Sequence, residues 1–247
     1  GENMEKKLLF FIIFLFVTVN IYAENIWNIF LNDFAKSGKT LIQNPVISLT
    51  YLSGIGIATV TLVHNDLLIK ECFNRNKTKF NDGLFDVFNL GGDGINVLAF
   101  NSFLYLSGVR DEKVAKEVTQ AVATSSLVTY IIKNISGRQR PADTDDRYSF
   151  SPFSFKDSFP SGHATVAFAW ATVISENYGI WYITYPVATM AAMARIYKNM
   201  HWASDVFMGA VIGTFCGKTI CSNRNSGIYI STRFDEDAPI LMVNMKY

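Results

Sequence analysis

The sequence predicts an all-α protein, a bundle of six helices that ends in a short β-hairpin. Hydrophobic residues make up 49% of the 247 residues and charged residues only 17%, below the roughly 25% that is typical of soluble domains. Long uncharged runs recur along the chain, and strand-like alternation is scarce before residue 227, which favours helices around one core. The formal charge of +1 argues against a nucleic-acid-binding module, which usually carries a strongly basic face.

The N-terminal residues have the pattern of an export signal. The basic pair Lys6-Lys7 precedes the apolar stretch 8–19, and the small residue Ala23 follows. This order is typical of a secretory signal peptide over residues 4–23, with an uncleaved anchor helix as the alternative. We therefore expect an exported protein, located in the periplasm or associated with a membrane.

One helical-bundle domain is expected over residues 46–222, between an amphipathic helix at 24–45 and a tail at 223–247. Apolar residues recur at helical spacing in the first flank, and the tail has two β-prone stretches around a charged turn. The six helices are expected from the uncharged runs Val46–Val63, Ile95–Val109, Val118–Ile132, Ala164–Ser175, Asn177–Ala194 and Val206–Gly217. Each run is shorter than the roughly 20 residues that cross a bilayer, which favours core helices over membrane spans.

Three motifs in this domain contain the candidate binding and catalytic residues. They are Lys133 with Arg140-Pro141, then Pro160-Ser161-Gly162-His163, then Arg195 with His201 and Asp205. The first closes the third predicted helix, the second opens the fourth, and the last lies between the fifth and the sixth. In an up-and-down bundle these four helix ends lie at the same pole, so the motifs are expected to meet.

The residue types fit an anion that has several negative oxygens. Lys133, Arg140 and Arg195 supply cations that can bind phosphate oxygens, the arginines in a bidentate way. The hydroxyl of Ser161 and the free backbone N–H groups of Ser161 and Gly162 add donors at a helix N-terminus. These residues are therefore the predicted phosphate-binding site.

Two histidines are candidates for the reacting groups. His201 and Asp205 share a helix face, so the carboxylate can accept from one imidazole nitrogen and leave the other as a nucleophile. His163 would then protonate the departing oxygen. Arg138 is predicted to be a supporting charge and His64 an ordinary structural residue. The sequence has no Cys or His pairs at ligand spacing, so neither a metal nor another cofactor is expected.

With these motifs the chain resembles the superfamily of type 2 phosphatidic acid phosphatases and vanadium-dependent haloperoxidases. The family signature is Lys, six residues, Arg-Pro; then Pro-Ser-Gly-His; then Ser-Arg, five residues, His, three residues, Asp. Here Ala194 replaces the Ser that often precedes the Arg. The resemblance implies the family's helical bundle and metal-independent hydrolysis of a phosphomonoester or diphosphate. It also implies a phosphohistidine intermediate on His201, which water attacks with His163 as the base.

The branches of this family leave three functions open. The leading one is a phosphatase for a lipid phosphate or diphosphate; the others are a soluble exported phosphatase of broad specificity and a haloperoxidase that holds vanadate through His201. Between the first two motifs lie Tyr148, Phe150, Phe153, Phe155 and Phe159. A lipid-facing rim and ordinary core packing explain these aromatic residues equally well.

The expected partner is a phosphate-bearing lipid or a small phosphoester, with no nucleic acid, and membrane association is left open. If residues 24–45 lay outside and all six runs crossed the membrane, the site would face the cytoplasm. This is awkward for an exported phosphatase, so a soluble or peripherally attached bundle with its site outside the cytoplasm is favoured.

Overall fold

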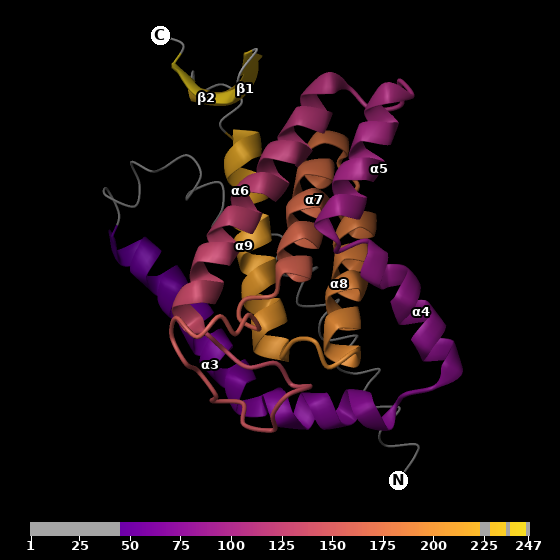
Figure 1. Ribbon diagram of the computed structural model, residues 1–247, viewed down its shortest axis with the longest axis vertical. Coiled ribbons are helices and arrows are strands. Elements are labelled where there is room, and N and C mark those ends of the chain that lie inside the picture. Colours follow the sequence, from indigo (N-terminus) through magenta and orange to yellow (C-terminus); the bar gives the residue numbers. More distant parts are fainter. Residues whose placement is uncertain (1–44, 223–227, 236–237, 246–247) are drawn as a thin grey trace.

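The computed structural model describes residues 45–222, 228–235 and 238–245, and Figure 1 shows them as a helical bundle with a hairpin at one end. The helices are α3 (Pro45–Arg75), α4 (Lys79–Leu90), α5 (Gly94–Leu106), α6 (Glu112–Ser136), α7 (Gly162–Tyr178), α8 (Trp181–Tyr197) and α9 (Ala203–Ser222). The predicted signal at 4–23 and, but for Pro45, the predicted helix at 24–45 lie outside the described residues.

The described residues form seven helices where six were predicted. The additional helix, α4, lies between the first two predicted helices, in a stretch for which no helix was predicted. Its first turn is capped by the Thr78 hydroxyl, which accepts from the N–H of Asn81 at 3.1 Å. Phe85 faces the core, whereas Asp82 accepts from the hydroxyl of Tyr197 at 2.6 Å. A search for uncharged runs misses such a helix, because only one of its faces is apolar.

Helix α7 lies inside the bundle, and nearly all of its side chains from Ala164 to Ser175 are buried. Helix α9 packs against it so closely that glycine is required at the contact. A Cβ atom on Gly213 would lie 2.1 Å from the carbonyl oxygen of Thr165, and one on Gly209 would lie 2.4 Å from that of Ser161. This close packing brings the first turns of α7 and α9 together at one pole.

The segment 137–161 covers the pole where α7 and α9 begin (Figure 1). Gly137 ends α6 with φ of +55°, and a Cβ atom there would lie 1.8 Å from the carbonyl oxygen of Ser151, so glycine alone fits. The N–H of Ser158 donates to the carbonyl of Arg138 at 3.0 Å. These contacts hold the segment in place over the helix ends.

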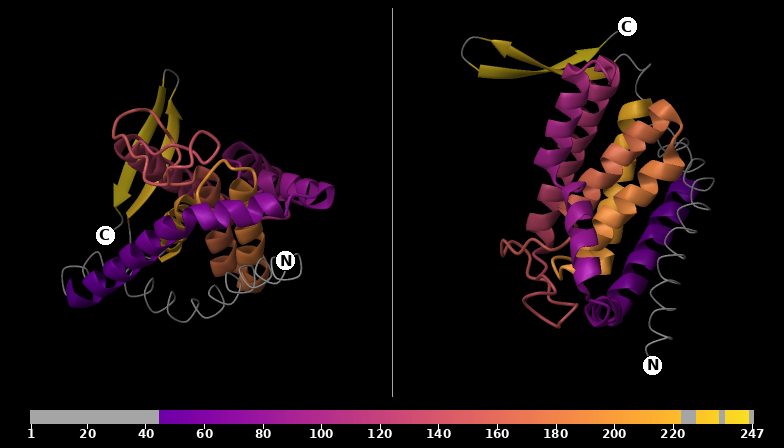
Figure 2. Two further views of the ribbon diagram at one scale, coloured as in Figure 1. Left: turned by 90° about the horizontal axis from the view of Figure 1, so that it is seen from below. Right: turned by 90° about the vertical axis from the view of Figure 1, so that its right-hand side faces the viewer.

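Strands β1 (Ile228–Asp235) and β2 (Ala238–Met245) form an antiparallel pair in which Ile228 lies opposite Met245. This hairpin lies at the end of the bundle opposite the segment 137–161 (Figure 2).

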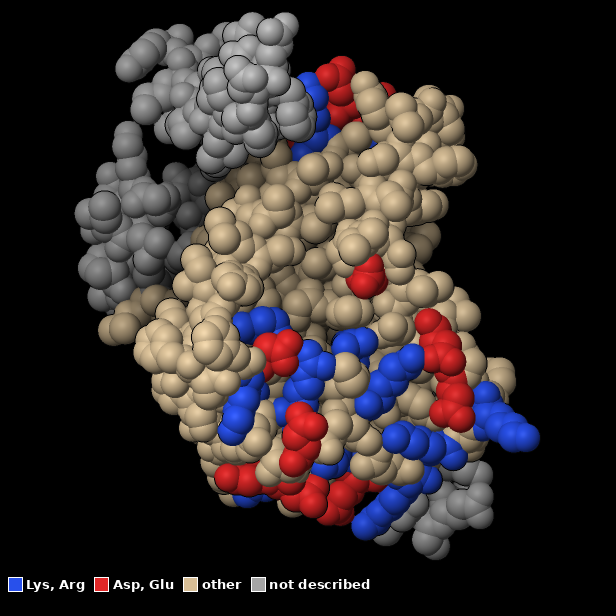
Figure 3. All heavy atoms as spheres, viewed as in Figure 1, with Lys and Arg blue, Asp and Glu red and all other residues tan. Residues whose placement is uncertain are grey.

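Charged side chains gather at the pole of segment 137–161, and a mostly uncharged band lies between it and the other end (Figure 3). Large apolar side chains are exposed on the outer faces of several helices, among them Leu52, Ile57 and Val60 in α3, Ile95, Phe103 and Leu106 in α5, and Leu127, Tyr130 and Ile131 in α6. One described helix segment, Leu52–Arg75, is long and apolar enough to cross a membrane. Exposed apolar area of this extent marks a surface that meets lipid or protein.

Candidate active site

The structure brings the predicted site residues to one pole. Lys133 lies in the last turn of α6, Ser161, Gly162 and His163 at the start of α7, Arg195 in the last turn of α8, and Asp205 in the first turn of α9. Arg140 lies in the covering segment and His201 in the connection between α8 and α9. The convergence predicted from the helix order is therefore present.

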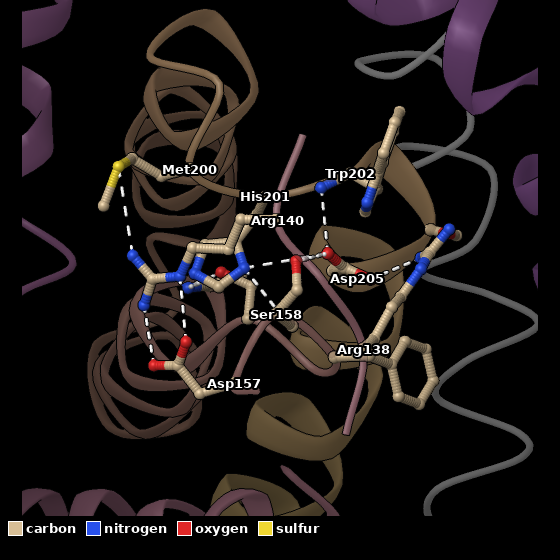
Figure 4. A network of polar contacts seen from close by, with 12 residues as sticks. Arg138, Arg140, Asp157, Ser158, Met200, His201, Trp202 and Asp205 are labelled. Carbon is tan, nitrogen blue, oxygen red and sulfur yellow. Dashed lines mark hydrogen bonds and ion pairs between the residues drawn. The ribbon is translucent and has the colours of Figure 1, made fainter. Parts of the chain in front are cut away.

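The imidazole of His201 is buried, and its acceptor differs from the predicted one (Figure 4). Its Nδ1 lies 2.8 Å from the carbonyl oxygen of Ser158 but 3.7 Å from Oδ2 of Asp205. A carbonyl oxygen can only accept, so Nδ1 carries the proton and Nε2 keeps its lone pair. Burial lowers the pKa of His201, which favours the neutral imidazole that a nucleophile requires.

Asp205 is completely buried and is held by donors on both of its oxygens. Its Oδ1 accepts from Arg138 at 2.5 Å, and its Oδ2 accepts from the hydroxyl of Ser158 at 2.6 Å and from the N–H of Trp202 at 2.9 Å. Burial alone would raise the pKa of Asp205, but these hydrogen bonds, the neighbouring His201 and the Arg138 charge hold it below its usual value. The ionised carboxylate lies close enough to stabilise a positive charge on the imidazole of His201.

Arg138 has a larger structural role than the supporting charge predicted for it. Its guanidinium is fully buried and bridges two carboxylates, Asp205 through Nη1 and Asp66 through Nη2, the latter at 2.8 Å. Sequence reasoning did not single out Asp66. Its one signal is an acidic residue inside a long apolar helix, which is rare unless the residue is paired.

The three predicted phosphate-binding cations surround this pole. Arg195 is buried and donates from Nη1 to Oδ1 of Asn89 at 2.7 Å, while its buried Nε has no hydrogen-bond partner among the described residues. Arg140 forms a two-point ion pair with Asp157, at 2.9 and 2.7 Å, and Lys133 donates to the Asp157 carbonyl oxygen. Asn89 and Asp157 were not anticipated, because short polar residues in turns carry no distinctive pattern.

The pKa values of Lys133, Arg195 and His163 are lowered at this pole. Burial, followed by repulsion from Arg140 and Arg195, lowers the pKa of Lys133 to about 8. Burial and Arg140 lower the pKa of Arg195 to about 10. Burial, Arg195 and His201 lower the pKa of His163 to about 4. A bound anion would relieve this repulsion, so the electrostatics of the pole favour a ligand with several negative charges.

The start of α7 differs in one detail from the prediction. The N–H of Ser161 is not free, because it donates to the carbonyl oxygen of Asp205 at 2.9 Å. Ser161 instead caps α7, and its hydroxyl accepts from the N–H of Ala164 at 3.5 Å. The amides of Gly162 and His163 belong to the first helical turn, where N–H groups lack an intrahelical acceptor. They remain suitable donors for an anion.

A cavity of about 250 Å³ opens beside His163 and Lys133, between α5, α6 and α7. Tyr130 and Val166 form apolar parts of its wall. The turn before α5 closes it on one side, where a Cβ atom on Gly92 would lie 3.0 Å from the Cβ of His163. The cavity therefore lies beside His163 and Lys133, and its wall includes Tyr130, one of the exposed apolar side chains of α6.

Residues 116–226 match the profile of the PAP2 superfamily, and this stretch includes all three motifs. Over this stretch the chain is similar to the PAP2 superfamily. This confirms the resemblance found in the motifs. Helices α3, α4 and α5 lie before the matched stretch.

Three comparisons show how far the PAP2 likeness extends. The chain is 45% identical over 67 residues to a lipid A 1-phosphatase of Porphyromonas gingivalis. This match covers 25% of this chain and only 15% of the length of that relative. The crystal structure of Aquifex aeolicus LpxE is 28% identical, with a TM-score of 0.53, and the likeness covers 63% of this chain and 93% of that one. A transmembrane PAP2-type phosphatidylglycerolphosphate phosphatase from Bacillus subtilis shares the fold at 16% identity, with a TM-score of 0.53 over 68% of this chain and 92% of that one.

Proposed function

We propose that this PAP2 protein is a metal-independent phosphatase that hydrolyses a phosphomonoester or diphosphate of a lipid through a phosphohistidine on His201. The observation that carries the proposal is a buried imidazole with one nitrogen occupied by a carbonyl, beside a cluster of mutually repelling cations. The family and the name of the lipid A 1-phosphatase relative support a phosphate-bearing lipid as substrate.

In the first step, Lys133, Arg195 and the first-turn amides of α7 hold the phosphate oxygens. Arg140 joins them when the phosphate competes successfully with Asp157 for its guanidinium. Nε2 of His201 then forms a bond to phosphorus while the bond to the leaving oxygen breaks. The imidazole becomes positively charged, keeps its Nδ1 proton on the Ser158 carbonyl, and is stabilised by the nearby Asp205 carboxylate.

His163 is the proposed proton donor to the leaving oxygen. With a pKa of about 4 it is neutral at pH 7 before substrate binds, and a neutral imidazole cannot serve as this acid. Burial is the main cause of this low pKa, and the positive charge of Arg195 lowers it further. A phosphate dianion beside Arg195 offsets that charge, so we expect substrate binding to be coupled to protonation of His163. After donating that proton, His163 takes one from the water that attacks the phosphohistidine, which regenerates His201.

The exposed aromatic residues favour a lipid over a soluble ester. Phe153 is 74% exposed, Phe155 88% and Tyr130 65%, and Tyr148 is also exposed. Ordinary core packing, the alternative explanation of the aromatic segment, does not account for side chains that face outward. Together with the apolar band they support a membrane-associated protein whose substrate reaches the site from a lipid surface. We also propose that the active pole lies outside the cytoplasm, because the pattern of residues 4–23 predicts an export signal.

Phosphate release tests this proposal directly. Detergent-purified protein, with a chelator and no added metal, is given phosphatidate, phosphatidylglycerol phosphate, an isoprenyl diphosphate and a soluble aryl phosphate. We expect a lipid to be preferred. We also expect His201→Ala to abolish turnover, because the described site offers no second nucleophile in its place, and His64→Ala, a matched histidine control, to keep the wild-type rate.

A labelled phosphate on the protein gives a second readout. A phosphohistidine survives alkali and is lost in acid, so alkali-stable label is expected on the wild type and not on His201→Ala. Appreciable turnover by His201→Ala would overturn the mechanism, and loss of activity with the chelator would overturn metal independence. Equal or faster turnover of the aryl phosphate would assign the protein to soluble phosphatases of broad specificity.

A further inference from the structure

Asp66 reaches the active pole from a helix that the PAP2 match does not include, since the match begins at residue 116. It is 1% exposed, although Leu68 two residues later is 60% exposed. A buried carboxylate costs free energy unless its oxygens are paired. Its partners therefore indicate its role.

Asp66 acts as an acceptor for the start of α9. Its Oδ1 accepts from the backbone N–H of Ser204 at 2.9 Å, and its Oδ2 accepts from the Ser204 hydroxyl at 2.5 Å. The first-turn amides of a helix have no intrahelical partner, so Asp66 caps α9 from a different helix. Ser204 is the residue immediately before Asp205. The cap therefore helps to hold the helical turn that carries the Asp205 carboxylate.

Asp66 also helps to set the orientation of the Arg138 guanidinium. Its Oδ2 accepts from Nη2 of Arg138 at 2.8 Å, while Nη1 donates to Oδ1 of Asp205 at 2.5 Å and to the Ser204 hydroxyl at 2.7 Å. With each terminal nitrogen bound to a different carboxylate, the guanidinium makes a one-point contact with Asp205. Oδ2 of Asp205 is then left to Ser158 and Trp202.

We propose that Asp66 is a positioning residue for catalysis, which fixes Asp205 through Arg138 and Ser204 and thereby fixes the imidazole of His201. The inference rests on the proposed function of His201 as the nucleophile. Without the Asp66 carboxylate, Nη2 of Arg138 keeps only its hydrogen bond to the Arg147 carbonyl oxygen, at 2.6 Å. We expect the guanidinium then to turn toward both oxygens of Asp205 and to draw Oδ2 away from Ser158. Because the Ser158 carbonyl holds Nδ1 of His201, this movement disturbs the nucleophile, although Asp66 touches neither the substrate nor the imidazole.

The test compares Asp66→Asn with Glu117→Gln. Glu117 is a matched control, because it is also a buried carboxylate and accepts from Asn177 at 2.8 Å, at the opposite end of the bundle. Kinetics are measured on the best substrate of the panel. Asp66→Asn should lower kcat about 10- to 100-fold, the usual range for a slightly misplaced reacting group, with KM within about threefold. Glu117→Gln should keep kcat within about twofold even if both variants melt earlier.

A second readout does not depend on turnover. With only three histidines in the chain, nitrogen NMR on histidine-labelled protein can identify the His201 signals by their loss in His201→Ala. We expect a single Nδ1–H tautomer in the wild type and in Glu117→Gln, and a mixture of tautomers in Asp66→Asn. If the wild type releases no phosphate from the panel, the proposed function fails, and the tautomers alone decide the role of Asp66.

Other outcomes would overturn the positioning role. One is an Asp66→Asn variant that melts earlier but keeps both the wild-type kcat and the single tautomer. Another is an equal loss of kcat in Glu117→Gln, which would indicate general destabilisation. If Asp66→Asn does not fold, Ser204→Ala tests the positioning role instead. This variant removes the hydroxyl that bridges Asp66 and Arg138 and leaves the carboxylate and the guanidinium in place. It should lower kcat about 3- to 10-fold, as a smaller misplacement, and an unchanged kcat would overturn the inference.

Discussion

Lys133 and His163 share the walls of one cavity but carry different charges at neutral pH. Burial depresses the pKa of both, to about 8 for the lysine and to about 4 for the histidine. The lysine therefore stays largely cationic, as the proposed phosphate binding requires, whereas the histidine is neutral in the unliganded site. The same buried environment thus leaves one group charged and the other neutral, because the ordinary pKa values of lysine and histidine differ.

The low pKa of Lys133 predicts an alkaline limb in the pH–rate profile of the enzyme. As pH rises through about 8, Lys133 loses its proton and the site loses a cation, so kcat/KM should fall. In Lys133→Arg the guanidinium stays protonated, and the limb should disappear while activity below pH 7 is reduced only modestly. Bound phosphate favours the ammonium, so the limb in kcat should lie at higher pH than the limb in kcat/KM. A pH–rate profile of both proteins checks this, and an unchanged limb in Lys133→Arg would assign it to another group.

The hydrogen-bond partners of single site residues cannot be predicted from the local sequence. The spacing of His201 and Asp205 correctly places both at the same pole, but it does not identify the atom that accepts the Nδ1 proton. That acceptor is the Ser158 carbonyl, in a segment whose path depends on contacts with α6 and α9. In the same way Ser161 is correctly predicted to begin α7, while its N–H is taken by Asp205.

At the level of elements, the contact between α7 and α9 depends on glycines four residues apart. Gly209, Gly213 and Gly217 face α7, and a Cβ atom on any of them would lie within 3 Å of an atom of α7 or of its N-cap residue Ser161. Residues four apart share one face of a helix, so this side of α9 has no side chains to hold the helices apart. The first turns that carry Ser161 and Asp205 are therefore brought within hydrogen-bond distance.

Substitution of these glycines should show what the close approach contributes. Gly213→Ala places a methyl group against the α7 backbone and should lower stability by about 1–3 kcal/mol or more, the usual cost of overpacking. Gly54→Ala in α3 is the control, because a Cβ atom there meets nothing within 4 Å. It should raise stability by about 0.5–1 kcal/mol, since alanine suits a helix interior better. Thermal unfolding in detergent measures both, and equal melting temperatures would contradict the packing argument.

At the level of the whole molecule, charge and apolar surface are separated along the bundle. The active pole holds most of the charged side chains on the face seen in Figure 3, and the band beside it is largely uncharged. Cations gathered at one end and apolar side chains around the middle suit a protein that takes a charged head group at a membrane surface while its sides meet hydrocarbon.

The side of the membrane on which the pole lies can be tested with cysteines. Cys72, Cys216 and Cys221 are buried, so the background labelling should be low. Ser154→Cys, exposed in the segment 137–161, should react with a membrane-impermeant maleimide in intact cells if the active pole faces outside the cytoplasm. Labelling only after the cells are opened would place the pole in the cytoplasm. Ser107→Cys, exposed at the opposite end, is the companion variant, and labelling of both in intact cells would indicate a bundle attached from outside.

The sequence by itself determined the helical class and the pole at which the motifs meet, and it predicts the kind of anion they bind. These features follow from helix periodicity, from the up-and-down order of the helices and from the charges of Lys133, Arg140 and Arg195, which are properties of the chain read in short stretches. Helix α4 was missed because its polar face interrupts any uncharged run.

The tertiary structure alone decided which atoms pair within the site. Ser204 and Asp66 lie 138 residues apart in the chain and are joined because α3 passes beside the start of α9. The same applies to Arg195 with Asn89 and to His201 with the Ser158 carbonyl. A hydrogen bond requires its two atoms to lie about 3 Å apart in a suitable direction. Such a distance between remote segments is set by the packing of whole helices, and no local pattern in the sequence records it.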